Sequence, residues 1–354
     1  MDPGKLNFKM PAEWTKHVRT FISWPVQSSM CYPEDYGAVC QGYREIIRAI
    51  SEFEAVTIVV NAADAEKAGR FSENEGIEYL IIEHNDAWLR DNGPTFLIND
   101  RGETAGVNWR FNAWGGKYAP WNLDDQVACL ILRHLGLQQF DAPLVMEGGS
   151  FHVDGEGTLI TTEECLLNPN RNPGLSKARI ESELRNFLNI KKVIWLKNGI
   201  SGDETDGHVD NIACFAAPGK ILLQVCNDPD DENYAITQVN LKILESETDA
   251  RGRNLEIIPI RQPCRMFHNN KRLPLSYLNF YFVNGGIILP VFGGKARETD
   301  RLAVQILGKV FPERRVRTVN GMQLIKEGGN VHCITQQMPV AKPDILNNSP
   351  GKLL

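Results

Sequence analysis

The sequence predicts an α/β fold in which one ββαβ unit recurs about five times and closes into a ring. Three observations carry this prediction. Helical periodicity recurs in five segments, a compact apolar strand follows each of them, and a polar or glycine-rich stretch then leads into further strand-like sequence. The period of roughly 50–70 residues is long for a solenoid and fits a ring of such units.

The five helices are expected at 35–53, 122–136, 176–189, 232–250 and 297–311. Several begin at candidate N-caps, Asn122 and Ser176 among them, with acidic residues in the first turn. The strands that follow the helices are predicted at 56–60, 143–146, 191–196, 255–260 and 314–319.

The polar stretches lie at 85–100, 146–162, 203–225, 276–292 and 327–337. In four of them a short turn joins two strand candidates, as in a hairpin. The last stretch lacks a second strand, and we expect the N-terminal segment 19–25 to supply it and to close the ring. The first unit is irregular because segment 61–82 intervenes.

A doubly wound parallel sheet is the alternative fold, and it usually carries a phosphate-binding loop at its switch point. Neither G-x-G-x-x-G after a strand nor G-x-x-x-x-G-K-[ST] occurs in the sequence. The ring of repeated units is therefore favoured. Because no linker or break in composition interrupts the chain, residues 1–354 are expected to form a single catalytic domain.

Composition narrows the class of partner. The net charge of the 354 residues is −6, with no long basic run, so nucleic acid and anionic membranes are poor partners and a small cation is favoured. The chain lacks an apolar leader and any apolar run of about 18 residues, which predicts a cytoplasmic protein. The oligomeric state stays open, with a homodimer as the leading expectation.

The eight cysteines are scattered without a C-x-x-C pair, and most are expected to be reduced core residues. Cys333 is the exception, because it lies between a Gly-Gly-Asn turn and a polar Thr-Gln-Gln segment. Equivalent ends of ring units converge on the axis, so the reactive residues of four polar stretches could meet there. These residues are Asp91, Glu147, His208 with Asp210, and Cys333.

The partner of Cys333 is inferred from strand alternation. If 206–210 is a strand, Asp206, His208 and Asp210 share one face, whereas His332 points away from Cys333. His208 is therefore predicted to be the partner of the thiol, and His332 is expected to be structural.

Several carboxylates around a thiol suit a cationic substrate. A guanidinium group offers coplanar N–H donors to carboxylates, and its central carbon is an electrophile for a thiolate. The bound cation would also favour the thiolate over the thiol. A metal site built from Asp91, Glu147, His208 and Asp210 is a competing use of the same acids, but it leaves Cys333 without a task.

At these residues the chain resembles the agmatine deiminases of the guanidino-group-modifying superfamily. The resemblance spans nearly the whole length and rests on stretches that occur in this order: "MPAEWTKHVRTFISWP", "NDAWLRDNGPTF", "FNAWGG", "EGGSFHVDGEGTLITTEECLLNPNRNP", "GDETDGHVDN", "SYLNFYFVNGGIILPVFG" and "GGNVHCITQQMP". It implies a fivefold pseudosymmetric α/β propeller. It also implies hydrolysis of agmatine to N-carbamoylputrescine and ammonia, a step toward putrescine, with no metal or organic cofactor.

Carried over by residue, the resemblance implies that Cys333 is the nucleophile and His208 the acid and base. Asp91 and Asp210 would hold the guanidinium, and Glu147 would hydrogen-bond to it and to His208. Four further residues are predicted to contribute to the substrate site: Trp88 and Trp114 as walls, Gly329 through close backbone approach, and Asn330 as the residue that fixes the turn.

One segment departs from the resemblance. Residues 261–275 are short compared with plant relatives, which leaves the binding of the amine end of the substrate uncertain. Two other functions therefore stay open. One is a deiminase of free or peptide-linked arginine, for which Arg90, Arg110 and Arg171 are available, and the other is a non-catalytic propeller that binds guanidino ligands.

Overall fold

The structure, a computed structural model, describes residues 2–29, 35–69, 71 and 76–341. Within these residues, five mixed sheets share one pattern, an antiparallel strand pair whose second strand also pairs in parallel with a third. Four sheets are β4 (Thr95–Ile98)–β5 (Thr104–Arg110)–β6 (Gln138–Val145), β7 (Phe151–Val153)–β8 (Thr158–Thr162)–β9 (Lys192–Leu196), β10 (Ala213–Ala217)–β11 (Lys220–Val225)–β12 (Glu256–Arg261) and β15 (Tyr281–Val283)–β16 (Gly286–Val291)–β17 (Arg315–Asn320).

The fifth sheet joins the two ends of the described chain. Its order is β18 (Thr335–Pro339)–β1 (His17–Ser23)–β2 (Ala55–Val60)–β3 (Ile77–Ile81). The predicted pairing of the N-terminal strand with the last polar stretch is confirmed, since β1 runs antiparallel to β18 with Thr20 opposite Gln337. The intervening segment 61–82 forms η2 (Ala62–Asp64), α2 (Ala65–Ala68) and the fourth strand β3.

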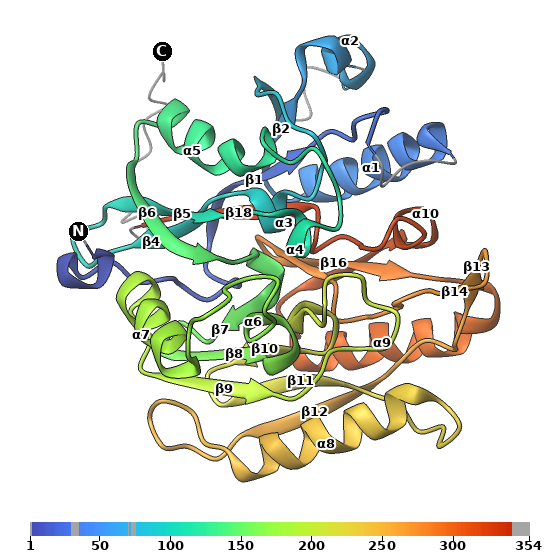
Figure 1. Ribbon diagram of the computed structural model, residues 1–354. Coiled ribbons are helices and arrows are strands. Elements are labelled where there is room, and N and C mark those ends of the chain that lie inside the picture. The colour runs from blue at the N-terminus through green and yellow to red at the C-terminus, as the bar shows by residue number, and fades with distance from the viewer. Residues whose placement is uncertain (1, 30–34, 70, 72–75, 342–354) are drawn as a thin grey trace.

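A long helix makes each parallel crossover. These helices are α1 (Tyr36–Ser51), α5 (Asp124–His134), α7 (Lys177–Leu188), α8 (Glu232–Ser246) and α9 (Arg297–Val310), and they lie on the outside of the molecule (Figure 1). All five lie within the predicted helical ranges. Ser176 is the N-cap of α7 as predicted, its side chain accepting a hydrogen bond from Arg179 N at 3.3 Å.

Two details of the prediction are wrong. The N-cap of α5 is Leu123 rather than Asn122, and it makes no side-chain cap. Strand β6 begins at Gln138, five positions before the predicted 143, because the polar residues of its first half still pair with β5. The α/β fold with mixed sheets is confirmed, and the closed fivefold propeller stays a prediction.

Short segments in front of the first strand of each sheet bring the polar stretches together. They are α3 (Leu89–Asn92), η3 (Gly148–Ser150), η4 (Val209–Asn211), the loop 276–280 and the turn 331–334. Segment α3 contacts both η3 and β18, and η3 contacts η4. Each unit therefore contributes its segment to one common region.

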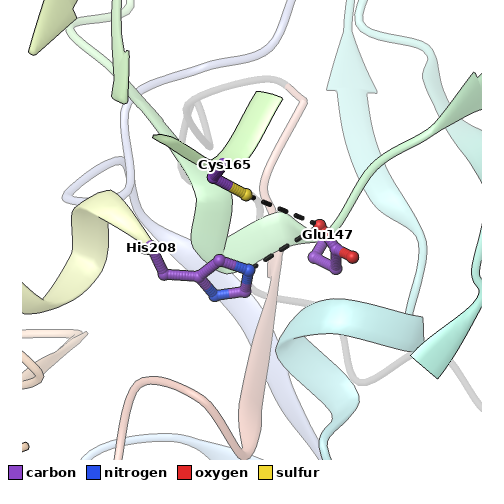
Figure 2. A group of neighbouring side chains, drawn as sticks. All are labelled: Glu147, Cys165 and His208. Atoms are coloured by element: carbon purple, nitrogen blue, oxygen red, sulfur yellow. Dashed lines mark hydrogen bonds and ion pairs between the residues drawn. The ribbon is translucent and has the colours of Figure 1, made fainter. Parts of the chain in front are cut away.

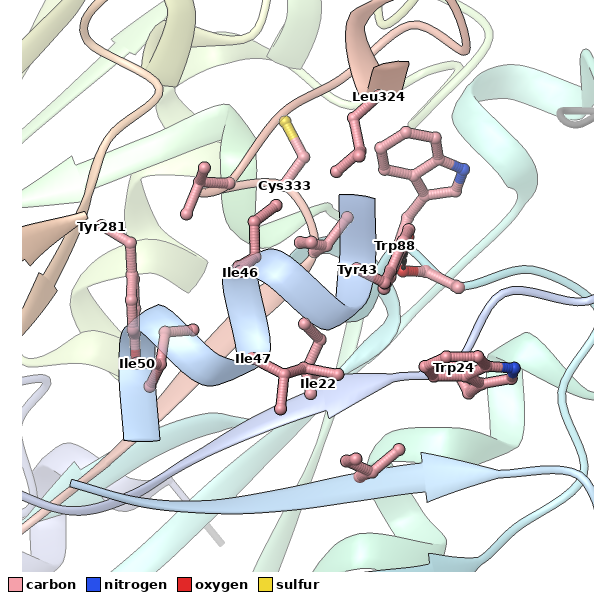
Figure 3. Close-up of a cluster of buried hydrophobic side chains, with 14 of the residues drawn as sticks. Ile22, Trp24, Tyr43, Ile46, Ile47, Ile50, Trp88, Tyr281, Leu324 and Cys333 are labelled. Atoms are coloured by element: carbon pink, nitrogen blue, oxygen red, sulfur yellow. Dashed lines mark hydrogen bonds between the residues drawn. The ribbon is translucent and has the colours of Figure 1, made fainter. Parts of the chain in front are cut away.

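The core cluster beneath this region includes Cys333. In Figure 3, Tyr43 and Ile46 of α1 lie beside Trp88 and Cys333, and the Cys333 side chain is 5% exposed. Packing against α1 thus fixes the backbone from which the thiol projects. Among the described residues, no helix is long and apolar enough to cross a bilayer.

The remaining described elements are short. They comprise η1 (Pro3–Leu6), α4 (Ala113–Gly116), α6 (Glu163–Leu166), the hairpin β13 (Phe267–His268)–β14 (Lys271–Arg272), η5 (Gly294–Ala296) and α10 (Met322–Ile325).

Candidate active site

Cys333 lies in the turn that precedes β18. Its Sγ accepts a hydrogen bond from Asn279 Nδ2 at 3.1 Å and lies 3.6 Å from Asp210 Oδ2. Burial, and then the negative charges of Asp210 and Asp91, raise the pKa of the Cys333 thiol well above its ordinary value. Without a cation beside it, the sulfur is therefore a thiol, and a positive ligand would favour the thiolate.

His208 lies between two carboxylates. Its Nε2 is 3.7 Å from Glu147 Oε2 and its Nδ1 is 3.9 Å from Asp91 Oδ2 (Figure 2 shows the Glu147 side). Both ring nitrogens are buried without a hydrogen-bond partner. Burial alone lowers the pKa of His208, but the charge of Asp91 and the nearby Cys165 and Glu147 side chains raise it well above its ordinary value. The ring is thus an imidazolium with two N–H groups available to a ligand or water.

Gly149 is the point at which three catalytic candidates converge. A Cβ added at this glycine would lie 2.7 Å from His208 Nδ1 and 2.9 Å from both Asp210 Oδ2 and Asp91 Oδ1. Any side chain would displace these groups, so the glycine is required for their close approach. Its backbone N–H also donates to Asp91 Oδ1 at 2.9 Å.

The Asp91 carboxylate accepts two hydrogen bonds that orient it, and its surroundings raise its pKa. Trp114 Nε1 donates to its Oδ2 at 2.9 Å, opposite the bond from Gly149. Burial, together with the charges of Asp210 and Glu147, raises the pKa of Asp91 to about 6, although His208 opposes the shift. A bound guanidinium would relieve this repulsion.

A pocket leads from solvent to Cys333 and Asp91. Its walls are aromatic, with Trp88 and Trp114 packed edge to face at 6.4 Å between ring centroids. The space between these walls, which is open to solvent, amounts to about 360 Å³. The lining residues are Trp88, Asp91, Trp114, Tyr118, Glu204, Thr205, Glu327, Gly328, Gly329 and Cys333.

Comparison with known proteins identifies the family. The sequence profile described as Porphyromonas-type peptidyl-arginine deiminase matches residues 9–339. The chain belongs to this family. Its curated relatives include the agmatine deiminase of Ectopseudomonas mendocina, 46% identical over 95% of this chain and 97% of the relative. The agmatine deiminase of Pseudomonas aeruginosa (strain LESB58) is 44% identical over 96% and 98%.

Solved structures of the same family share the fold. The agmatine deiminase of Enterococcus faecalis superposes with a TM-score of 0.90 at 37% identity, covering 96% of this chain and 98% of that one. A substrate-bound cysteine-to-serine variant of the C. jejuni agmatine deiminase gives a TM-score of 0.85 at 28% identity, over 94% and 96%. The predicted resemblance to agmatine deiminases is therefore confirmed.

The strand-face argument was wrong in its premise. Residues 209–211 form the 3₁₀ turn η4, and Gly207 has a left-handed φ of 83°, so 206–210 is not a strand. Asp206 consequently turns away from His208 and pairs with Arg171 at 2.6 Å. Within the described part of the chain, the His332 ring hydrogen-bonds to Glu13 and Asp210 rather than to the Cys333 sulfur, and its Nδ1 donates to Asp210 Oδ2 at 2.9 Å.

The predicted substrate residues divide into two groups. Trp88, Trp114 and Gly329 line the pocket. A Cβ at Gly329 would come within 2.4 Å of the Trp88 ring, so this glycine lets the loop approach the wall. Asn330 is absent from the lining residues and instead fixes the loop, donating from Nδ2 to the Gly321 carbonyl at 3.0 Å.

Three residues near the site were not predicted to act there. Asn279 holds the Cys333 sulfur through its side-chain amide. Arg171 is fully buried and its Nε lies 2.7 Å from Glu147 Oε1. Cys165 Sγ lies 4.0 Å from Glu147 Oε2 (Figure 2).

The positive charge of Arg171 argues against a metal ion bound at Glu147. Among the described residues, the group close enough to share an ion is Glu147, Cys165 and His208, with ligand atoms within 4.8 Å of one another. The Arg171 guanidinium already neutralises Glu147 there. Burial raises the pKa of Glu147, but the nearby His208 ring and the charge of Arg171 lower it overall. A second cation at Glu147 would be repelled by Arg171.

Proposed function

We propose that this protein hydrolyses agmatine to N-carbamoylputrescine and ammonia through a covalent adduct on Cys333. The observation that carries the proposal is a buried cysteine at the inner end of an aromatic pocket, beside two carboxylates that pair with no Lys or Arg among the described residues. Asp91 reaches the same pocket, and Asp210 Oδ1 is buried without a hydrogen-bond partner. These acids suit a guanidinium, and the family relatives are named for this reaction.

The reaction proceeds in two halves. Cys333 attacks the guanidinium carbon, which Asp91 and Asp210 hold. The carbon–sulfur bond forms as the thiol releases its proton to solvent, the protonated His208 ring gives its own proton to the leaving nitrogen, and one carbon–nitrogen bond breaks to release ammonia. Water then adds to the thiouronium carbon while His208 takes its proton. The carbon–sulfur bond breaks and the ureido product leaves, a step toward putrescine. In this scheme Glu147 orients His208, and no metal or organic cofactor takes part.

The outer end of the pocket favours an amine over an α-carboxylate. Glu204 and Glu327 line it, and none of the described lining residues is a Lys or Arg. The arginines that could have bound a carboxylate are engaged elsewhere or exposed: Arg90 pairs with Glu13, Arg171 with Glu147 and Asp206, and Arg110 lies on the surface. Agmatine is therefore the better substrate than free or peptide-linked arginine.

Two measurements test the proposal. Ammonia release from agmatine should exceed that from arginine, and faster turnover of arginine would overturn the choice of substrate. A haloacetamidine, which mimics the guanidinium, should alkylate Cys333 selectively. Cys333→Ala should lose both turnover and labelling, whereas Cys129→Ala, on the partly exposed helix α5, should keep both. Retained turnover in Cys333→Ala would point to another nucleophile, and no turnover by the wild type would leave a guanidino-binding protein.

The organisation of the molecule is part of the same proposal. We infer that the five sheets form a fivefold pseudosymmetric propeller and that residues 1–354 act as one catalytic domain, supported by the repeated strand order and the β1–β18 pairing.

We also propose a cytoplasmic homodimer. Seven free cysteines among the described residues suit a reducing compartment. Fractionation of cells tests the location, and light scattering after size-exclusion chromatography tests the dimer.

A further inference from the structure

A buried chain of charged groups runs from the reactive cysteine to the N-terminal segment. His332 Nδ1 lies 2.9 Å from Asp210 Oδ2, and His332 Nε2 lies 3.0 Å from both carboxylate oxygens of Glu13. All three side chains are at most 3% exposed. Glu13 precedes β1, so a residue from the start of the chain supports the site formed near its end.

Other titratable groups meet this chain at its far end. Arg90 NH1 lies 3.3 Å from Glu13 Oε1, and His152 Nε2 lies 3.5 Å from Glu13 Oε2. Burial and Arg90 lower the pKa of His332, but Glu13 and Asp210 raise it above its ordinary value. Burial raises the pKa of Glu13, yet His332, Arg90 and His152 bring it well below its ordinary value. His332 is therefore an imidazolium held between two carboxylates.

The contacts leave one oxygen of Asp210 available to a substrate. Oδ2 accepts the His332 bond and lies near Cys333 Sγ, whereas Oδ1 is buried with no hydrogen-bond partner. The backbone of His332 is also fixed, because its N–H donates to Asn279 Oδ1 at 3.0 Å. The same Asn279 holds the Cys333 sulfur. The position of the carboxylate and that of the sulfur are thus set through one residue.

We propose that Glu13 and His332 form a charged clamp that positions Asp210, so that Oδ1 faces the guanidinium beside the Cys333 sulfur. His332 acts through Asp210 and is a positioning residue, and Glu13 acts by keeping His332 protonated. The inference rests on the proposed function, because it assigns the clamp to the guanidinium-binding carboxylate. It departs from the expectation that His332 is only structural.

The first test changes the charge of the clamp and keeps its shape. Glu13→Gln leaves a hydrogen-bonding side chain of the same size but removes the carboxylate that raises the pKa of His332. The protonated ring is the competent form, so it is lost at lower pH in the variant. The ratio of wild-type to variant kcat/KM should therefore rise with pH, measured from about pH 5 to about pH 9.

A matched control is available elsewhere in the fold. Glu54 is also buried and pairs with a buried histidine, His17, at 3.0 Å, but this pair does not contact Asp210. Glu54→Gln should give a kcat/KM ratio that does not vary with pH. A constant or falling ratio for Glu13→Gln, with each kcat/KM expressed per folded protein at that pH, would overturn the role of the charge.

The second test measures how the clamp affects the rate at which Cys333 is alkylated. His332→Ala should slow alkylation of Cys333 by chloroacetamidine, whose amidinium needs Asp210, by about 10- to 100-fold, the effect of one charge-assisted hydrogen bond. Alkylation by neutral iodoacetamide should change by less than about threefold. Equal slowing of both reagents, or no slowing of chloroacetamidine, would overturn the proposal.

The labelling comparison separates two kinds of failure. If wild-type protein released no ammonia from agmatine, the proposed function would fail, and the ratio of the two alkylation rates would still measure the clamp. If wild-type protein turned over agmatine and His332→Ala kept its kcat, KM and alkylation ratio, only the clamp would fail. His332→Gln should recover part of the lost selectivity, since its amide can donate to Asp210.

Discussion

Replacing Asp91 with asparagine should stabilise the fold while abolishing turnover. The carboxylate is 5% exposed and lies among other acids, and burial raises its pKa from 3.8 to about 6. A pKa that is raised on folding means that the ionised form costs stability in the folded state. This cost is absent below the unfolded pKa and is fully present once the pH exceeds about 6.

The size of the effect follows from the shift. Each pKa unit corresponds to about 1.4 kcal/mol, so a shift of about two units gives roughly 3 kcal/mol at neutral pH. Asparagine can keep one of the two bonds that Asp91 accepts from Trp114 Nε1 and Gly149 N, both 2.9 Å, but not both as charge-assisted bonds. Losing one costs about 1–2 kcal/mol. The net gain for Asp91→Asn should then be about 1–2 kcal/mol above pH 7.

Urea unfolding of wild type and Asp91→Asn across pH provides the assay. The difference in unfolding free energy should favour the variant above about pH 7 and diminish as the pH falls through about 6 toward 4. Asp231→Asn is the opposite control: burial raises the pKa of Asp231, but its bonds to Asn233 and Arg272 lower it overall. That variant should be less stable at neutral pH. A pH-independent difference, or a less stable Asp91→Asn at neutral pH, would refute the reasoning.

Three further predictions concern other parts of the site. Glu204→Gln should raise the KM for agmatine by about two- to fivefold with little change in kcat, because a partly exposed ion pair is weak; an unchanged KM in steady-state ammonia assays would exclude Glu204 from amine binding. Arg171→Gln should cost about 3–5 kcal/mol in urea unfolding, since it leaves Glu147 buried without its cation, and a loss below 1 kcal/mol would contradict this. Cys333→Ser should bind agmatine at least about tenfold more tightly than N-carbamoylputrescine by calorimetry, and equal affinities would show that the carboxylates do not recognise charge.

The repeated architecture could be predicted because each element carries its own local signal. Amphipathic periodicity set the five helices to within a few residues, and the missing last strand pointed to β1 as its partner. The first half of β6 escaped detection because its polar residues resemble a loop. Sheet pairing, rather than composition, makes Gln138 part of the strand.

The sequence could predict that the candidate site residues lie close together, but not which contacts they make. Asp91, Glu147, His208 and Cys333 come together because each lies in or next to a segment that precedes the first strand of a sheet. The contacts could not be predicted because they depend on local backbone geometry. A left-handed glycine and a 3₁₀ turn replace the strand assumed at 206–210, and His332 meets a glutamate 319 positions away. A contact between residues so far apart in the chain leaves no periodic pattern in a single sequence.

The electrostatics of the site connect binding, chemistry and product release. Before substrate enters, burial and neighbouring acids raise the pKa values of both Asp91 and the Cys333 thiol, so the pocket is short of positive charge. A guanidinium supplies that charge, which stabilises the carboxylates and the thiolate together. The ureido group of the product is neutral and cannot do so. Loss of the cation by the reaction itself therefore restores the repulsion between the acids, and the product is released from a site that favours only its precursor.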